Sequence, residues 1–198
     1  MRGQAMKRIC DKLIINGFRL DKYIALEFFA REGNWQTQSF SQFVKTLHAW
    51  EIDEKFKEQL LLNHPNANIR IGDSFNISRE LKYKSFFDFI VIDNPQGVFN
   101  GYCEHFEALN RVKFLLKNSG IVIFNVNKKP FNYSENSNWA IRRNNFYGRN
   151  ANKLDTEFLV HFYGKFFNDI NFKVNEIFEE KRNNEYLSYI VAIIEKLK

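Results

Sequence analysis

Four acidic residues stand at or near the ends of apolar runs in the chain: Glu27, Glu51, Asp73 and Asp93. Carboxylate oxygens accept hydrogen bonds from the hydroxyl and amino groups of a ligand. If these runs are parallel strands, their carboxyl ends meet at one edge of a sheet, where ligands of such sheets bind. We therefore expect the four acids to face a common cleft. The alternative role is structural, because Asp is also a favoured residue at the start of a helix, as at Asp73 and Asp93.

Strands and helices alternate along the chain. Strands are predicted over residues 23–29, 48–53, 68–73, 87–93, 121–126, 172–178 and 186–194. Helices are predicted over residues 5–17, 38–47, 54–62, 103–116 and 157–168. Near-continuous apolar runs in the central strands are typical of a sheet that is covered on both faces. The sequence predicts one α/β domain over residues 1–198, doubly wound, with a mostly parallel seven-stranded sheet, helices on both faces and a C-terminal antiparallel hairpin.

The composition excludes several classes of protein. Hydrophobic residues make up 44% and charged residues 26% of the 198 residues, values typical of a globular chain and not of a disordered one. No apolar run approaches the roughly 18–20 residues that a membrane-spanning helix needs. Cys10 and Cys103 are too few for a disulfide framework, and the histidines show no metal-ligand spacing. We expect a soluble cytoplasmic protein without a bound metal.

Positive charge is concentrated in two segments. Residues 1–22 hold six Lys or Arg against two Asp, and residues 128–153 hold six against one Glu. The second segment also contains Phe131, Tyr133, Trp139, Phe146 and Tyr147. Cations bind phosphates while aromatic rings stack on bases, so residues 128–153 are interpreted as an insertion or lid that meets an anionic or nucleic-acid acceptor. A solvated surface, or a lid with its aromatics packed inward, remains the alternative.

Five segments together resemble the class I S-adenosylmethionine-dependent methyltransferases. Residues 27–33, Glu-Phe-Phe-Ala-Arg-Glu-Gly, are similar to the first motif of the family in its acid-x-Phe-Ala-Gly-x-Gly form. Glu51 stands in the place of the ribose-binding acid, and residues 72–75, Gly-Asp-Ser-Phe, are similar to the adenine-side motif. Residues 87–95 resemble the fourth motif, and residues 115–122 resemble the helix-Gly-strand segment that follows it.

The resemblance implies methyl transfer from S-adenosylmethionine. The residues that it implies for binding this cofactor are Glu27, Phe29, Ala30, Arg31, Gly33, Glu51, Asp73, Ser74, Phe75 and Asp93. Arg31 replaces the middle glycine of the first motif. Its side chain would either turn outward or pair with the carboxylate of the cofactor, or else block the pocket and leave a binding module that does not methylate.

The acceptor is less well defined than the cofactor. Residues 93–95, Asp-Asn-Pro, begin like the Asp/Asn-Pro-Pro-aromatic loop of nucleobase methyltransferases, but Gln and Gly follow at residues 96–97. This departure favours a small or anionic acceptor over a nucleic-acid base, which is kept as the alternative. The catalytic candidates are Asp93 and Asn94, with His105 as a base for a hydroxyl acceptor.

Overall fold

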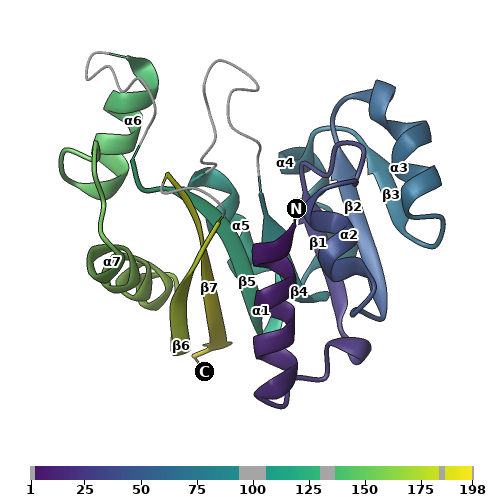
Figure 1. The fold of residues 1–198 in the computed structure, drawn as a ribbon, viewed down its shortest axis with the longest axis horizontal. Coiled ribbons are helices and arrows are strands. Elements are labelled where there is room, and N and C mark those ends of the chain that lie inside the picture. The colour runs from purple at the N-terminus through teal and green to yellow at the C-terminus, as the bar shows by residue number, and fades with distance from the viewer. Residues whose placement is uncertain (1–2, 94–105, 130–136, 183–185, 198) are drawn as a thin grey trace.

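Seven strands form one mixed sheet in the order β3-β2-β1-β4-β5-β7-β6 (Figure 1). The computed structural model describes residues 3–93, 106–129, 137–182 and 186–197. The strands are β1 (Ile24–Phe28), β2 (Thr46–Glu51), β3 (Asn68–Ile71), β4 (Phe87–Ile92), β5 (Leu116–Asn127), β6 (Phe172–Lys181) and β7 (Leu187–Lys196). Strands β3, β2, β1, β4 and β5 are parallel, whereas β7 pairs antiparallel with both β5 and β6. The predicted fold class, including the C-terminal hairpin, is confirmed.

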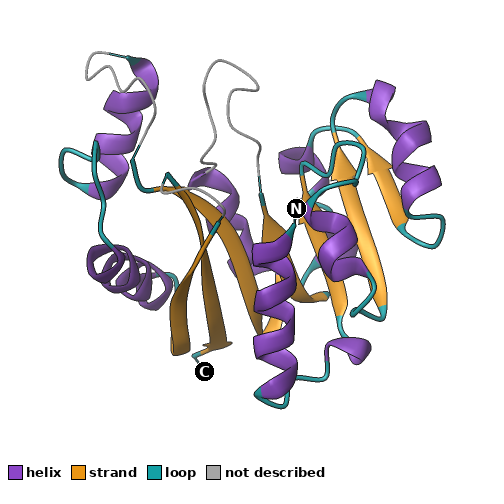
Figure 2. Cartoon of the chain, viewed as in Figure 1, coloured by secondary structure: helices purple, strands orange, loops and turns teal. Residues whose placement is uncertain are grey.

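Helices cover both faces of the sheet (Figure 2). They are α1 (Gln4–Ile15), α2 (Gln36–Ser41), α3 (Lys57–Asn63), α4 (Ser74–Ile77), α5 (Phe106–Leu115), α6 (Asn138–Tyr147) and α7 (Thr156–Asp169). Successive side chains of β4 point to opposite faces of the sheet and so pack into two parts of the core. Phe89 and Val91 pack with α1 and α2. Ile90 and Ile92 pack with α5 and α7. Within the described residues, no helix has the length and apolarity needed to cross a bilayer.

The structure corrects two of the predicted boundaries and adds one helix. The helix predicted over residues 38–47 ends at Ser41, because Thr46 and Leu47 already pair with β1. Strand β5 begins at Leu116 and not at Ile121, since Ser119 and Gly120 pair with β7. Helix α6 lies inside the basic segment, where no helix was predicted.

Local sequence signals explain where α6 and α7 begin. The side chain of Ser137 accepts a hydrogen bond from the backbone N–H of Ala140, and Asp155 accepts one from Phe158. Helix α6 ends at Gly148, whose φ of 65° is the left-handed conformation that favours glycine. These caps set the first residue of both helices and the last residue of α6.

Candidate functional site

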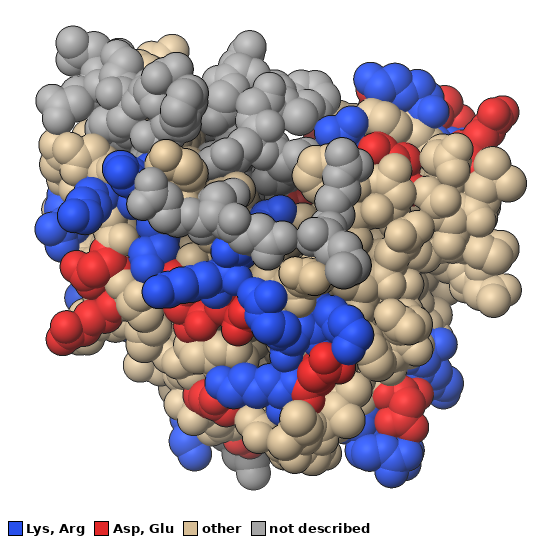
Figure 3. Space-filling model, in the orientation of Figure 1, with Lys and Arg blue, Asp and Glu red and all other residues tan. Residues whose placement is uncertain are grey.

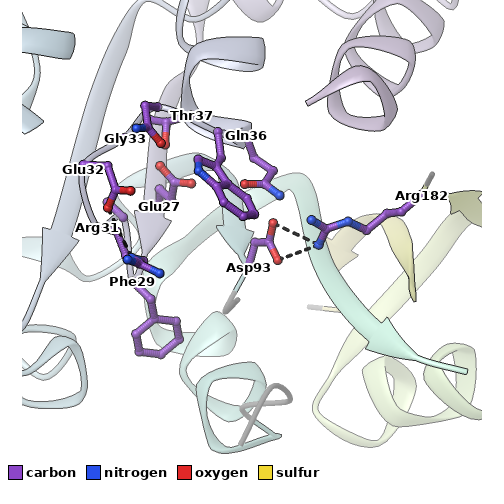
Figure 4. Close-up of a pocket in the computed structure, with 12 residues that line it drawn as sticks. Glu27, Phe29, Arg31, Glu32, Gly33, Gln36, Thr37, Asp93 and Arg182 are labelled. Atoms are coloured by element: carbon purple, nitrogen blue, oxygen red, sulfur yellow. Dashed lines mark hydrogen bonds and ion pairs between the residues drawn. The ribbon is translucent and has the colours of Figure 1, made fainter. Parts of the chain in front are cut away.

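A pocket opens at the carboxyl ends of β1 and β4, where the strand order reverses. It encloses about 400 Å³, counting its open mouth, and is lined by Glu27, by residues of the loop 29–37, by Asp93 and by Arg182. Figure 4 shows Asp93 and Arg182 pointing toward each other from different elements, with Glu27 and Gln36 directed into the same space. Two of the four predicted acids therefore share one cavity.

Glu27 is buried in this pocket with only part of its hydrogen-bonding capacity used. It is 4% exposed, and the side chain of Thr37 hydrogen-bonds to its carboxyl group. Its Oε2 has no partner among the residues that the structure describes. Burial raises the pKa of Glu27 to about 8, with smaller contributions from the negative charges of Asp93 and Glu51. A ligand cation or hydrogen-bond donor would satisfy this oxygen.

Asp93 is held by two groups from the C-terminal hairpin. Arg182 Nη1 lies 3.1 Å from Oδ1 and 3.4 Å from Oδ2 of Asp93, and the hydroxyl of Tyr189 donates to Oδ2 at 2.6 Å. Burial and then the charge of Asp93 raise the pKa of Tyr189 well above its ordinary value. Burial lowers the pKa of Arg182, but the charge of Asp93, the charge of Tyr189 and the hydrogen bond to Asp93 together outweigh this effect, and the net shift is upward. Asp93 and Arg182 therefore form an ion pair at the wall of the pocket.

The loop after β1 has a backbone conformation that is typical of glycine. Phe29, Arg31 and Gly33 have φ values of 61°, 51° and 69°. Arg31, which stands where the first motif has its middle glycine, thus has a left-handed conformation that is strained for a residue with a Cβ. Its Nε lies 3.2 Å from Oε2 of Glu32, and its guanidinium lies 4.8 Å from the ring centroid of Phe56. Arg31 pairs with neighbouring side chains at the pocket wall.

Glu51 and Asp73 are engaged with the backbone. Glu51 is 4% exposed and accepts hydrogen bonds from the N–H groups of Arg31, at 2.8 Å, and Asp53, at 2.9 Å. Asp73 accepts from the N–H of Phe75 at 2.8 Å and caps α4. The structural role that the sequence offered as an alternative is therefore present at Asp73. Each carboxylate oxygen still has a second lone pair with which to accept from a ligand.

The sequence-predicted cofactor residues divide into two groups. Those that line the pocket are Glu27, Phe29, Ala30, Arg31, Gly33 and Asp93. Those that lie outside its lining are Glu51, Asp73, Ser74 and Phe75. The two groups are in contact, because Glu51 holds the backbone of Arg31 and the ring of Phe75 lies 6.1 Å from that of Phe29. The catalytic candidates Asn94 and His105 lie outside the described residues.

Sequence reasoning missed the residues that reach the pocket from elsewhere. Arg182 lies in a charged turn that has the composition of a solvated hairpin loop, and Tyr189 lies in an apolar strand. They are 89 and 96 residues away from Asp93, so no local spacing connects them to it. Gln36 and Thr37 begin α2, two residues before the helix predicted over residues 38–47, and no functional role was predicted for them. Sequence separation therefore hid Arg182 and Tyr189 but not Gln36 and Thr37.

Comparison with solved structures identifies the fold as the Rossmann-like fold of the class I S-adenosylmethionine-dependent methyltransferases. One similar structure is a Burkholderia thailandensis 1,6-didemethyltoxoflavin-N1-methyltransferase with bound S-adenosylhomocysteine (16% identity, TM-score 0.57, covering 99% of this chain and 80% of that one). Another is M. jannaschii TYW2 in complex with AdoMet (14%, 0.52, 96% and 77%). A third is a candidate RNA methyltransferase from Pyrococcus horikoshii (14%, 0.55, 98% and 85%). No protein-family model and no curated protein sequence matches the chain.

Proposed function

We propose that the protein is an S-adenosylmethionine-dependent methyltransferase. The observation that carries this proposal is a carboxyl oxygen of Glu27 that has no partner within the described residues and is buried in a pocket at the carboxyl ends of β1 and β4 of a sheet with methyltransferase strand order. Leaving a buried polar atom without a partner costs about 1–3 kcal/mol, so its presence favours a ligand that satisfies it.

The residues of the pocket fit this cofactor. The ammonium group of the methionine part would favour the ionised form of Glu27, whose Oε2 would then accept from it, and the left-handed loop 29–33 lets a ligand approach the backbone. Glu51 and Asp73, at the ends of β2 and β3, stand where acceptors for ribose hydroxyls and an adenine amine are needed. The bound cofactor would supply a methyl group activated on a sulfonium sulfur. The protein has to hold the acceptor in line with that group and exclude water.

The ion pair of Asp93 with Arg182 supports a small or anionic acceptor. Asp93 is the acid that would hold the amino group of a nucleobase, but its oxygens already accept from Arg182 and Tyr189. A guanidinium beside the reaction site instead favours an acceptor that carries negative charge.

A nucleic-acid acceptor is the second candidate. Figure 3 shows Lys and Arg gathered in a band over α1 and the β6–β7 hairpin. Arg8 of α1 reaches this hairpin, where it donates to the carbonyl of Lys181 and pairs with Glu180. Lys12 pairs with Glu176, so acids offset part of the positive charge in the band. Binding of RNA or single-stranded DNA that weakens steeply between low and physiological salt would favour this candidate.

Calorimetric titration with S-adenosylhomocysteine tests the cofactor site. Glu51→Gln removes the charge but keeps one acceptor for the backbone N–H groups, and we expect it to weaken binding by about 1–3 kcal/mol. Asp73→Asn should weaken binding by a similar amount. Because asparagine also caps helices, this variant should keep the start of α4 intact. Glu58→Gln, at an exposed position of α3, is the matched control and should leave the affinity unchanged.

Wild-type protein that does not bind S-adenosylhomocysteine would rule out the proposed function. Binding that survives unchanged in both variants would instead remove Glu51 and Asp73 from the cofactor site. Transfer of labelled methyl from S-adenosylmethionine to pooled small anions, RNA and single-stranded DNA then distinguishes the acceptors. Binding without transfer to any pool would favour a non-catalytic cofactor-binding module.

A further inference from the structure

We propose that Arg182 binds an anionic group, a carboxylate or a phosphate, of the ligand held in this pocket. The inference deepens the proposed function and rests on it for the identity of the ligand, but the anion site itself can be tested without cofactor. It concerns a residue of the C-terminal hairpin and does not depend on any of the sequence motifs.

Arg182 is anchored on one side and free on the other. Its Nη1 hydrogen-bonds to Asp93, and its guanidinium carbon lies 4.9 Å from the ring centroid of Tyr189. Within the part of the chain that the structure describes, its Nε and Nη2 find no acceptor. The side chain is 17% exposed and lines the pocket. Two N–H groups of a fixed planar fork therefore remain available, and this geometry matches a carboxylate or a phosphate.

Asp93 acts as a positioning residue for this fork. The side chain of Asp93 is 4% exposed, and the 2.6 Å hydrogen bond from Tyr189 fixes its Oδ2. A single carboxylate that is itself held in place orients the guanidinium but leaves most of its hydrogen-bonding edge unused. In this low-dielectric position a second anion would be bound more strongly than at an exposed arginine.

The charge of the pocket also permits an anion. Besides Asp93, the other buried acid of the lining is Glu27, and its raised pKa of about 8 keeps it mostly protonated at neutral pH. Glu32, a third acid of the lining, pairs with Arg31, so the carboxylate that offsets the guanidinium of Arg182 is that of Asp93. The anionic group has two sources in such a pocket, the carboxylate of the cofactor's methionine part or an acidic group of the acceptor.

The first arm of the test titrates inorganic phosphate and acetate into the cofactor-free protein at constant ionic strength. Fluorescence of Trp35, which lines the pocket, is the readout, with calorimetry as a check. Arg182→Gln should weaken phosphate binding at least about fivefold. Arg182→Lys keeps the charge but loses the fork, so it should bind phosphate with intermediate affinity. Lys181→Gln is the matched control, since it removes the same charge from the exposed neighbouring residue and should change binding less than about twofold.

The second arm compares S-adenosylhomocysteine with 5′-methylthioadenosine, which lacks the amino-acid part. If Arg182 holds the carboxylate of the cofactor, Arg182→Gln weakens binding of the first compound only. If it holds an acceptor group, Arg182→Gln leaves both affinities unchanged and still weakens phosphate binding. Either result supports the anion site and identifies its source.

The proposal is overturned if Arg182→Gln and Lys181→Gln bind phosphate equally well and both keep the wild-type preference between the two nucleosides. Failure of wild-type protein to bind either nucleoside would overturn the proposed function alone, because the phosphate titration still decides the role of Arg182. Should Arg182→Gln not fold, as judged by circular dichroism, the affinities of Arg182→Lys against wild type decide in its place.

Discussion

Two regions of the molecule each bury an ionisable side chain, and they differ in whether the hydrogen-bonding atoms of that side chain have partners. Glu27 in the pocket is 4% exposed, and its Oε2 has no partner in the described residues. Arg143 on α6 is fully buried, and it donates from Nε to the carbonyl of Ala151 at 3.1 Å and from Nη2 to that of Asn127. The guanidinium of Arg143 also lies 5.2 Å from the ring of Tyr147.

The difference separates a structural group from a ligand site. Around Arg143 the guanidinium donates to backbone carbonyls of the chain itself, and the hydroxyls of Tyr147 and Tyr163 lie 2.8 Å apart in the core. Around Glu27 a carboxyl oxygen lacks a partner in the part of the chain that the structure describes, and Phe29 and Arg31 hold strained left-handed conformations. Strain and unsatisfied groups persist where function requires them. Burial of a charge alone therefore says little about function.

The same comparison bears on the basic segment 128–153. Arg143 and Tyr147 of this segment pack inward, and Lys128 pairs with the buried Glu179 at 2.9 Å. These residues match the alternative interpretation, a segment whose aromatics face the core. Lys129, Arg149 and Lys153 are exposed and are the cations that an acceptor would meet. The role of this segment in acceptor binding stays a prediction.

The largest effect is expected from Arg143→Ala. The substitution leaves the buried carbonyls of Ala151 and Asn127 unpaired and opens a cavity, so we expect a loss of about 3–5 kcal/mol in the free energy of unfolding. Urea denaturation followed by circular dichroism measures it. Arg149→Ala, at an exposed position six residues after Arg143, should cost less than about 1 kcal/mol. Equal losses of stability in the two variants would show that the buried Arg143 contributes no more to the fold than an exposed arginine does.

The next largest effect is expected from Glu27→Gln, which should raise the free energy of unfolding, whereas Arg143→Ala lowers it. The folded pKa of Glu27, about 8, lies above its unfolded value of 4.5, so the folded state holds the proton more tightly. The stability that this residue contributes is complete below pH 4.5 and is lost as the pH rises through 8. At pH 7 the amide should therefore stabilise the protein by roughly 3 kcal/mol relative to the wild type. The same variant should weaken S-adenosylhomocysteine binding.

Urea denaturation of the two proteins at several pH values checks this prediction. The difference in unfolding free energy should be close to zero near pH 4.5 and should grow until about pH 8. Glu58→Gln, on the exposed face of α3, provides the matched control. A Glu27→Gln protein that is less stable than the wild type at pH 7 would show that Glu27 is satisfied within the fold, like Arg143.

Replacing one tyrosine by phenylalanine in each region should have a smaller effect on stability, and in one region it should also affect phosphate binding. Tyr189→Phe removes the hydrogen bond to the charged Asp93, and Tyr147→Phe removes the one to Tyr163. We expect losses of about 2 and 1 kcal/mol in stability, since bonds to charged groups are the stronger ones. Only Tyr189→Phe should also change phosphate binding, because it loosens the group that positions Arg182. A change in phosphate binding in Tyr147→Phe of the same size would contradict the separation of the two regions.

The fold could be predicted from the sequence where the pattern is local. The sequence alone shows the apolar run of β4, the apolar faces of α5 and α7, and the polar turn of the hairpin. The start of β5 could not be predicted, because residues 116–120 have the composition of a turn and become a strand only by pairing with β7. Helix α6 was hidden by its polar composition, although Ser137 and Gly148 are its caps.

The candidate site could be predicted only in part, because some of its residues meet only through long-range strand pairing. Glu27 and Asp93 each end an apolar run, so their place at one edge of the sheet follows from the alternation of strands and helices. Arg182 and Tyr189 join them only through the antiparallel insertion of β7 between β5 and β6. Long-range pairing of this kind leaves no spacing in the sequence that could be read.

The smallest effect is expected from Arg31→Gly, which restores the residue type that the backbone favours. With φ at 51°, Arg31 carries strain that glycine relieves, but glycine also gains entropy in the unfolded chain, so the net stabilisation should be below about 1 kcal/mol. The N–H of residue 31 still donates to Glu51, and S-adenosylhomocysteine affinity should stay equal to the wild type or rise. Thermal denaturation and calorimetry measure the two quantities. Arg31→Ala is the matched control, because it removes the same side chain but keeps the Cβ and hence the strain. If both variants lose affinity equally, the Arg31 guanidinium contacts the ligand directly, and this contact, not close approach of the ligand to the backbone, explains the arginine at this position.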